Sequence, residues 1–257
     1  MFKIETNKAQ RREEVEVSGR LDSEMVARGL FATRSKAQSA IRDGLVLVDG
    51  IACDKPGRKV SDSNVLEVSG RVLPYVSRGG LKLERAIETW DIDLSGACVL
   101  DIGSSTGGFT DCALMHGASR VIAVDVGTDQ MVEPLRSDPR IELYEQTDFR
   151  LLDHELLRDV TVATIDVSFV SATLMVEKLS ALPSLHHVVC LVKPQFECGA
   201  SAAKAHKGVI RDERLRAEAV DKVRGAFEEA GFACSGVVES PITGGDGNVE
   251  FLAHFVR

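Results

Sequence analysis

The sequence predicts an α/β protein: its main part is a doubly wound sheet, and a smaller α+β domain precedes it. Three observations predict this. An apolar run at residues 99–102 leads through a glycine-rich turn into a helical pattern, as a parallel strand leads into a helix. Strand-like and helical segments then alternate up to residue 230. Near the N-terminus, Asp49-Gly50 separates two short apolar runs, which is a strong hairpin signal.

The composition favours a cytoplasmic protein. The chain has 257 residues, 44% of them hydrophobic, which is enough for one or two domains with full cores. Apolar runs such as residues 188–192 are far too short to cross a bilayer, and no signal-peptide pattern opens the chain, so we expect no membrane contact. The six cysteines are scattered without a Cys-x-x-Cys pair, which argues against a metal site and against a disulfide framework.

The N-terminal part divides into an extension and a module. Residues 1–18 are polar with little apolar periodicity, and we expect a flexible extension. Residues 19–68 form the module, in which helical spacing predicts a short helix after Arg20 and a second helix that ends at Gly44. Its strands are predicted at residues 45–48, 51–53 and 64–68.

A linker and one larger domain follow. Residues 69–77 contain Gly and Pro without periodicity and read as the linker, so the larger domain spans residues 78–257. Its first helix carries Lys82 in the first turn, where a cation opposes the helix dipole. Strands are predicted at residues 99–102, 121–127, 141–144, 162–167 and 186–192, and further helices at 109–116 and 212–230.

The end of the chain predicts an antiparallel hairpin. Residues 232–239 and 249–256 are strand-like and bracket a glycine-rich turn. Residues 195–209 read as a long loop, a candidate lid or RNA-facing segment. The fold class is therefore a Rossmann-like doubly wound sheet with an antiparallel C-terminal hairpin.

The glycine-rich turn at residues 103–108 predicts a ligand site, because glycines let the backbone come close to a ligand at a helix N-terminus. Its spacing is not Gly-x-Gly-x-x-Gly, and no Gly-x-x-x-x-Gly-Lys-Ser/Thr motif occurs, so NAD and triphosphates are disfavoured. Asp101, two positions before Gly103, attracts a cation and repels phosphate. S-adenosylmethionine, with its sulfonium and ammonium groups, fits this pattern. The alternative is an ordinary turn without a ligand.

Charged side chains follow several of the predicted strands. Asp101, Asp125, Asp166 and Lys193 stand at or just past carboxyl ends, where open α/β sheets bind ligands. Each alone has a simpler explanation, as a helix cap or a surface charge. Glu250 lies within an apolar strand, and burying its carboxylate is costly unless a cation such as a lysine meets it.

The N-terminal module also carries a resemblance. The stretch RLDSEMVARGLFATRSKAQSAIRDGLVLVDG, followed by DKPGRKV, resembles the small RNA-binding domain named after ribosomal small-subunit protein four. This implies binding of structured RNA mainly through backbone and shape. Residues 1–75 carry 13 basic against 11 acidic residues, whereas the remainder carries 18 against 28. The basic residues expected to contact RNA are Arg20, Arg28, Arg34, Lys36, Arg42, Lys55, Arg58 and Lys59.

The larger domain carries a second resemblance. The motifs SRGGLKLERAIE, LDIGSSTGGFTDCAL, VIAVDVG, TIDVSF, LVKPQFE, KGVIRD and GNVEFLAHF follow one another. They resemble the FtsJ-like ribose 2'-O-methyltransferases, and residues 20–257 as a whole resemble the TlyA (haemolysin A) family of ribosomal RNA cytidine 2'-O-methyltransferases. The resemblance implies S-adenosylmethionine as cofactor and ribosomal RNA, within a ribosomal subunit, as the substrate of a monomer.

The resemblance also assigns residues. The Lys-Asp-Lys-Glu catalytic set of the family corresponds to Lys82, Asp166, Lys193 and Glu250. At position 148 the chain has Asp after Thr147, where such proteins often have Asn. The implied cofactor-binding residues are Asp101, Gly103, Ser105, Gly107, Gly108, Phe109, Asp125, Asp148 and Phe149.

Physical chemistry suggests a division of labour. A ribose 2'-hydroxyl is a poor nucleophile, so transfer needs a group that takes its proton as the methyl arrives. We expect Lys193 to be this base, because a partly desolvated lysine near a second lysine gives up its proton more readily. Asp166 would orient Lys193, Lys82 would position the ribose or a phosphate, and Glu250 would hold Lys82 or the hydroxyl.

Two other functions remain open. A membrane-active haemolysin requires an apolar or basic amphipathic membrane segment, which the sequence does not show. An RNA-binding protein with an inactive Rossmann-like scaffold would not bind S-adenosylmethionine, which calorimetric titration would reveal.

Overall fold

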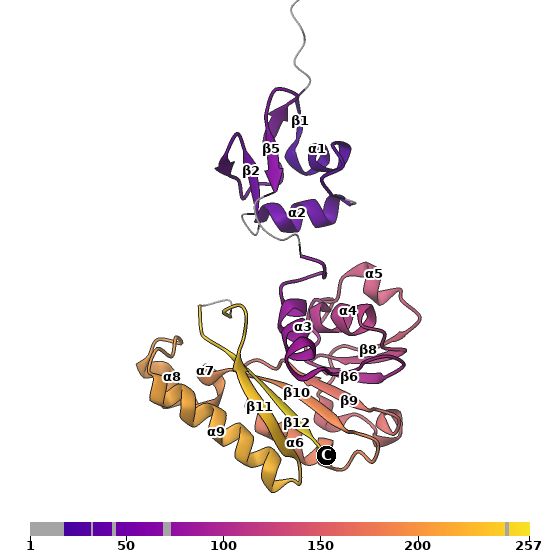
Figure 1. Ribbon diagram of the computed structural model, residues 1–257, viewed down its shortest axis with the longest axis vertical. Coiled ribbons are helices and arrows are strands. Elements are labelled where there is room, and N and C mark those ends of the chain that lie inside the picture. The colour runs from indigo at the N-terminus through magenta and orange to yellow at the C-terminus, as the bar shows by residue number, and fades with distance from the viewer. Residues whose placement is uncertain (1–17, 32, 43–44, 69–72, 245–246) are drawn as a thin grey trace, which may run out of the picture. The chain divides into compact units, whose positions relative to one another are not determined.

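The computed structural model describes residues 18–31, 33–42, 45–68, 73–244 and 247–257 (Figure 1). The chain forms two compact units, Met1–Val72 and Leu73–Arg257, and each is described by itself. The predicted extension, apart from its last residue, lies outside the described residues, as does residue 44, where the second helix was expected to end.

The described residues of the small unit form two helices and five short strands. The helices are α1 (Leu21–Ala27) and α2 (Arg34–Arg42). The strands are β1 (Ser18–Arg20), β2 (Val46–Val48), β3 (Ile51–Ala52), β4 (Lys59–Ser61) and β5 (Leu66–Val68). β2 pairs with β3 and β5, and β1 pairs with β4, all antiparallel.

The predicted hairpin of this unit is confirmed by its turn. Asp49 and Gly50 both have positive φ, 55° and 77°, as the two-residue turn that suits strand twist requires. Leu21, Met25 and Ile41 are fully buried against the sheet, which gives the unit a core of its own. The sequence did not predict β1 and β4, because three-residue strands leave almost no alternation to detect.

The large unit contains a sheet of seven strands in the order β11-β12-β10-β9-β6-β7-β8. The five strands β6 to β10 are parallel, and β12 is antiparallel to both β10 and β11. Their bounds are β6 (Cys98–Ile102), β7 (Arg120–Val124), β8 (Ile141–Tyr144), β9 (Val162–Ile165), β10 (His187–Val192), β11 (Ala233–Glu239) and β12 (Phe251–Val256). The predicted doubly wound sheet and its antiparallel C-terminal hairpin are therefore confirmed.

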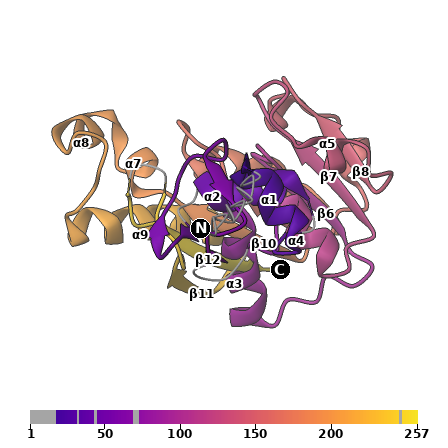
Figure 2. The same cartoon turned by 90° about the horizontal axis from the view of Figure 1, so that it is seen from above.

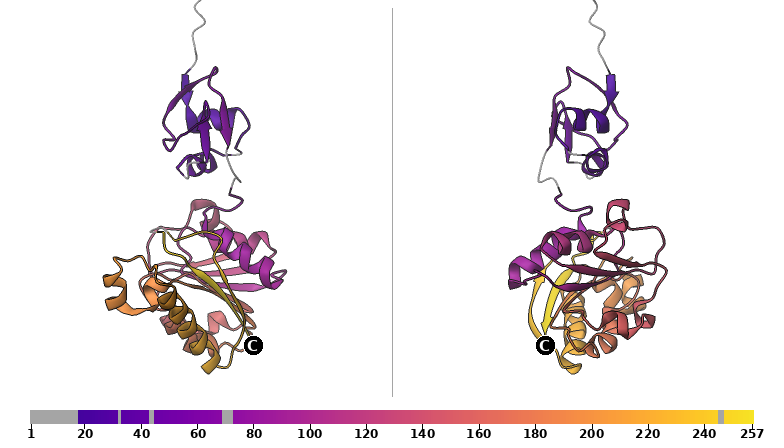
Figure 3. Two further views of the ribbon diagram at one scale, coloured as in Figure 1. Left: turned by 60° about the vertical axis from the view of Figure 1, so that its left-hand side comes forward. Right: turned by 90° about the vertical axis from the view of Figure 1, so that its right-hand side faces the viewer.

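Helices cover both faces of this sheet (Figure 3). The helices are α3 (Gly79–Trp90), α4 (Gly108–Met115), α5 (Glu133–Arg136), α6 (Val176–Ser180), α7 (Pro194–Glu197), α8 (Gly199–Ala205) and α9 (Glu213–Glu229). Short 3-10 turns lie at Phe149–Leu151, His154–Leu157 and Ala172–Met175. Figure 2 shows α5 and α8 at opposite ends of the sheet.

The two cores follow from the alternation of side chains along the strands. Val99 and Val121 pack with α3 and α4 on one face. Leu100 and Ile122 face the other side, where α6 and α9 contribute Leu179, Phe227 and other apolar residues. Because both faces are covered, the ends of the parallel strands are left as the place for a site.

Three local expectations differ from the structure. Residues 195–209 are not one loop, since most of them belong to α7 and α8. Glu250 precedes β12 instead of lying within it. Residues 73–77, assigned to the linker from the sequence, pack with the large unit: Tyr75 is 4% exposed and its hydroxyl donates to Glu84 at 2.9 Å.

Candidate active site

The turn after β6 has a shape that only glycine allows at its first position. Gly103 has φ +87°, and a Cβ atom there would lie 2.6 Å from the carbonyl oxygen of Asp166. Glycine therefore lets the ends of β6 and β9 approach each other. Gly107, at φ +94°, precedes α4, and a Cβ there would collide with Leu135.

Asp125 at the end of β7 holds this turn in place. Its carboxylate accepts hydrogen bonds from the backbone N–H of Ser105 at 2.8 Å and of Gly127 at 2.7 Å. Ser105 itself has a positive φ of 45°, an uncommon conformation for a residue with a side chain. Each carboxylate oxygen has further lone pairs, so Asp125 remains able to accept hydrogen bonds from ribose hydroxyls.

Asp101 lies beneath the turn and lines neither of the pockets described below. It is 1% exposed, and its two oxygens accept hydrogen bonds from the hydroxyls of Thr110 at 2.6 Å and Thr164 at 2.9 Å. Burial raises the pKa of Asp101 to about 6, against the effect of the two threonines. The structure therefore places Asp101 beneath the turn and outside the walls of both pockets, where its carboxylate supports the turn through the two threonines.

Two joined pockets open at the carboxyl ends of the strands. The helix pocket lies between the turn, α3 and residues 242–244, and has a volume of about 240 Å³. The strand-end pocket lies over β6, β7 and β9 and has a volume of about 360 Å³. Both include Gly103, Ser105 and Asp166 in their walls. Together they reach the size of sites for small molecules, roughly 300–1,000 Å³.

The four predicted catalytic residues come together as two ion pairs. The Nζ of Lys82 lies 2.6 Å from an oxygen of Glu250, and their side chains are 10% and 3% exposed. The Nζ of Lys193 lies 2.6 Å from an oxygen of Asp166, and their side chains are 9% and 21% exposed. Lys193 also donates to the hydroxyl of Ser168 at 2.8 Å.

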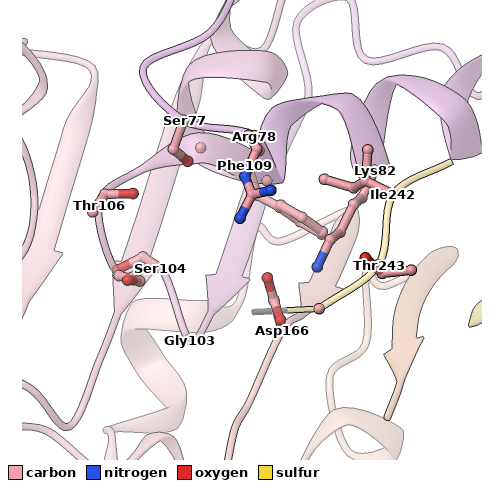
Figure 4. Close-up of a pocket in the computed structure, with 14 residues that line it drawn as sticks. Ser77, Arg78, Lys82, Gly103, Ser104, Thr106, Phe109, Asp166, Ile242 and Thr243 are labelled. Atoms are coloured by element: carbon pink, nitrogen blue, oxygen red, sulfur yellow. The ribbon is translucent and has the colours of Figure 1, made fainter. Parts of the chain in front are cut away.

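Only two of these four residues line the helix pocket. Lys82 reaches it from α3 and Asp166 from the end of β9, so that both side chains point into the same space (Figure 4). Lys193 and Glu250 stand behind them as their ion-pair partners. A hydroxyl placed in this pocket therefore faces one ammonium and one carboxylate directly.

The strand-end pocket suits an uncharged or cationic group better than a phosphate. Among its lining residues are the three acids Asp125, Asp148 and Asp166 and one cation, Arg150, which is already paired with Asp148. Such a charge balance repels phosphate and favours hydroxyls or a positive charge. These carboxylates can accept hydrogen bonds from the ribose hydroxyls and the adenine amine of S-adenosylmethionine and can attract its sulfonium.

The other predicted cofactor residues divide between the pocket walls and the core. Gly108 and Phe109 line the helix pocket, and Asp148 and Phe149 line the strand-end pocket. The ring of Phe149 is 3% exposed and belongs to the hydrophobic core. Gly107 is absent from both pocket walls and shapes the turn only.

Several residues of the pocket walls were not predicted. Arg78 and Thr243 line the helix pocket, and Val126 and Phe169, which are 75% and 88% exposed, line the strand-end pocket. Phe169 also has a positive φ of 67°, which is rare for an aromatic residue. One signal in the sequence could have pointed to Phe169. The strand-end acid Asp166 is followed directly by Val167-Ser168-Phe169-Val170, and large apolar residues are uncommon in an exposed loop at such a position.

In the small unit, some of the basic residues predicted to bind RNA have structural partners. Arg20 and Arg34 donate to Asp22, which is fully buried. The Arg20 guanidinium and its neighbours hold the pKa of Asp22 well below its usual range. Arg28 donates to backbone carbonyl groups of residues 61 and 64. The remaining members of the set are exposed: Lys36, Arg42, Lys55, Arg58 and Lys59.

Two further findings concern the described residues alone. No group of three or more His, Cys, Asp or Glu side chains among them is arranged to hold a metal ion. No helix formed by them is both long and apolar enough to span a bilayer.

Comparisons with known proteins agree with this geometry. A family profile described as FtsJ-like methyltransferase matches residues 75–257, and a profile described as S4 domain matches residues 19–66. YqxC of Bacillus subtilis, whose name assigns it provisionally to the rRNA methyltransferases, is 45% identical over 91% of this chain and 84% of its own length. The 16S/23S rRNA (cytidine-2'-O)-methyltransferase TlyA of Mycobacterium tuberculosis is 40% identical over 91% and 88%.

A solved structure extends the similarity to three dimensions. A Streptococcus thermophilus protein described as a candidate hemolysin is 41% identical, with a TM-score of 0.70 over 93% of this chain and 88% of that one. The resemblances noted in the sequence thus extend over nearly the whole chain.

Proposed function

The chain belongs to the FtsJ-like methyltransferase family, and on that premise we propose that it transfers a methyl group from S-adenosylmethionine to the ribose 2'-hydroxyl of a cytidine in ribosomal RNA. The observation that carries the proposal is the pair of buried lysine–carboxylate contacts at the helix pocket. Buried lysines are costly, and at the mouth of a pocket they indicate chemistry.

The residues divide the work according to their positions. We assign to Lys193, as the neutral amine, the removal of the 2'-hydroxyl proton. Its Nζ lies 2.6 Å from an oxygen of Asp166, so a hydroxyl that binds beside Asp166 in the pocket comes close to this amine, and Asp166 and Ser168 orient it. Lys82 uses one of its three N–H groups on Glu250, which leaves the others for the ribose or a neighbouring phosphate. Asp166, which lines the pocket, also stabilises the positive charge that Lys193 acquires with the proton.

S-adenosylmethionine, when bound, supplies a methyl group already activated by the sulfonium. We assign its binding to the joined pockets, with Gly103, Ser105 and Asp125 at the turn and Asp148 and Phe149 in the strand-end pocket. Gly108 and Phe109 line the helix pocket, and Asp101 and Gly107 shape the turn. The side chains of Lys82, Lys193 and Glu250 are almost completely covered, so water has little access to the two amines beside the pocket.

The small domain brings the enzyme to its substrate. We propose that its exposed basic residues contact the backbone of structured ribosomal RNA, and that the substrate is an assembled ribosomal subunit in the cytoplasm, met by a monomer. Arg20, Arg28 and Arg34 belong to this surface while they also hold the fold of the domain.

One experiment tests the function. The purified protein is incubated with S-adenosylmethionine and ribosomal subunits from a strain that lacks this protein, and the RNA is digested to nucleosides for mass spectrometry. We expect 2'-O-methylcytidine to appear. Methylation on a base, or RNA binding without any methyl transfer, would contradict the proposal.

A further inference from the structure

One segment of the large domain differs from the rest in charge. Residues 198–211 contain Lys204, Lys207 and Arg211 and no Asp or Glu. Residues 76–257 as a whole carry 28 acidic against 18 basic residues. All three basic side chains are exposed. The segment comprises α8 and the turn that leads to α9.

A buried asparagine fixes this segment to another loop. Asn248 is 1% exposed and lies between β11 and β12. Its side-chain amide donates to the carbonyl oxygen of Gly208 at 2.8 Å, and its side-chain oxygen accepts from the backbone N–H of Ile210 at 2.9 Å. Lys207 and Arg211 immediately flank these two anchored residues, so their positions are tied to the loop between β11 and β12.

The same loop forms a wall of the helix pocket. Thr243 and Gly244 line that pocket, and the backbone N–H of Gly244 donates to the carbonyl oxygen of Asn248 at 2.9 Å. Two residues later, Glu250 pairs with Lys82. Figure 1 shows α8 on the same side of the domain as this loop. A continuous chain of contacts therefore connects the basic turn to the pocket.

A basic segment close to the pocket suits a polyanionic ligand that passes beside the pocket. An RNA strand that places a ribose in the pocket continues on both sides of it, and its phosphates meet a domain with an excess of carboxylates, which repel them. Exposed lysines and arginines offset this repulsion only within about 10 Å, because salt screens longer distances. Lys207 and Arg211 flank Gly208 and Ile210, which Asn248 holds to the loop that forms this wall of the pocket.

We propose that Lys204, Lys207 and Arg211 bind phosphates of the RNA strand next to the nucleotide that enters the pocket. This inference rests on the proposed function and adds a second RNA contact surface, located on the methyltransferase domain itself. The contacts are made to the backbone and are independent of sequence.

The test compares two double variants of the full-length protein. Lys207→Gln/Arg211→Gln removes two charges from the basic turn. Arg140→Gln/Arg158→Gln removes two exposed charges that precede β8 and β9, at the opposite edge of the parallel strands. Thermal unfolding and S-adenosylmethionine titration confirm that both variants are folded. The affinities for ribosomal subunits and for deproteinised ribosomal RNA, both from a strain lacking this protein, are then measured across a series of salt concentrations.

We expect Lys207→Gln/Arg211→Gln to weaken binding at least about tenfold near 0.1 M salt, and the slope of log K against log salt to fall by about 1.4 to 1.8, at about 0.7 to 0.9 per phosphate contact. The Arg140→Gln/Arg158→Gln variant should keep the wild-type slope. Equal losses in both variants, or no loss in either, would overturn the inference. A loss seen with ribosomal subunits and absent with deproteinised RNA would also overturn it, by indicating a protein partner.

The two proposals fail in distinguishable ways. If the wild-type protein binds RNA with the expected difference between variants and yet transfers no methyl group, the proposed function is wrong and the RNA surface stands. If methyl transfer occurs and the salt slopes are equal, only the RNA surface is wrong.

Discussion

The ion pairs of Asp22 in the small domain and the two lysine pairs at the helix pocket of the large domain are buried in different ways. In the small domain the acid is inside: Asp22 is fully buried, and its partners Arg20 and Arg34 are 45% and 54% exposed. At the helix pocket of the large domain the cations are buried as well, since the side chains of Lys82 and Lys193 are 10% and 9% exposed. Away from that pocket, Lys222 and Glu197 of the same domain repeat the arrangement of Asp22, with side chains 46% and 2% exposed.

The difference separates pairs that fold a domain from pairs that do chemistry. An arginine at the surface neutralises a buried acid and keeps most of its own hydration. A buried lysine loses its hydration, and a well-packed apolar pair of the same volume is often no less stable. The Asp22 cluster is therefore explained by the stability of the small domain, whereas the two lysine pairs need a functional explanation. Four predictions test this distinction, from the largest expected effect to the smallest.

The largest effect concerns the proposed base. Lys193→Ala should lower kcat by about 1,000-fold, because general base catalysis contributes ~10² to 10⁴. The dissociation constants for S-adenosylmethionine and RNA should stay close to those of the wild type. Arg34→Ala removes an ion-pair partner of Asp22 in the small domain and should leave kcat unchanged at saturating RNA, while it raises the KM for RNA because Arg34 belongs to the proposed RNA-binding surface. Turnover retained by Lys193→Ala would remove that residue from its role.

The second prediction concerns the more deeply buried pair. Glu250→Ala leaves Lys82 buried without its partner and should reduce the free energy of unfolding of the large domain by about 3 kcal/mol. Lys82→Met/Glu250→Leu should regain most of this stability in denaturant unfolding while methyl transfer stays lost. If the double variant transferred methyl groups, the Lys82–Glu250 pair would serve only the stability of its domain, as the Asp22 cluster does.

The third prediction concerns pH and Asp101. Its pKa in the folded protein is raised to about 6, so the folded state binds the proton more tightly than the unfolded chain. This carboxylate therefore lowers stability above about pH 6, and the penalty disappears as the pH falls from 6 to 4. Relative to Asp101→Asn, the wild type should gain about 2 to 3 kcal/mol between pH 7 and pH 4.

The measurement is denaturant unfolding of both proteins at several pH values. Asp101→Asn keeps the volume of the side chain and lacks the titration, so the difference between the two curves isolates this group. A difference that does not change with pH would show that Asp101 is not desolvated in the folded protein.

The smallest effect should be found at Asp22. Asp22→Ala should reduce the free energy of unfolding of the small domain by about 2 kcal/mol, because hydrogen bonds from half-exposed arginines are lost. Since the pKa of Asp22 is lowered, its contribution is present above about pH 4 and is lost at lower pH. Thermal melts should show this change, with an unaltered affinity for S-adenosylmethionine. A weakened cofactor affinity would contradict the separation of the two clusters.

The sequence was most informative where one physical rule acts alone. Strand-end charges predicted the meeting of Asp166 with Lys193, because parallel strands end at one edge. An acid predicted within an apolar strand called for a cation, and although Glu250 directly precedes β12, Lys82 is that cation. The hairpin at Asp49-Gly50 followed from turn chemistry.

Where two roles compete for the same residue type, the sequence could not decide. Asp101 lies near the end of β6, and Asp166 follows the neighbouring strand β9. Only Asp101 is covered, by threonines from α4 and β9, and the sequence does not show this because the cover depends on how the elements pack. Arg20 and Arg34 look like RNA ligands from their charge alone, and only the fold brings them to Asp22. Helix α7 was missed because four residues are too few for a helical period to show, and α8 was missed because its sequence, Gly-Ala-Ser-Ala-Ala-Lys-Ala, has no large apolar residue to mark a buried face.

The hydrogen bonds from Ser105 and Gly127 to Asp125 have a consequence for turnover. They set the backbone of the turn before any ligand arrives, so little free energy is spent on ordering it. The demethylated product, S-adenosylhomocysteine, shares the same nucleoside and should therefore also bind this preset turn, although it lacks the sulfonium that the acids of the strand-end pocket attract. We therefore expect S-adenosylhomocysteine to inhibit the enzyme. The rate of methyl transfer in the cell should then depend on how quickly this product is removed.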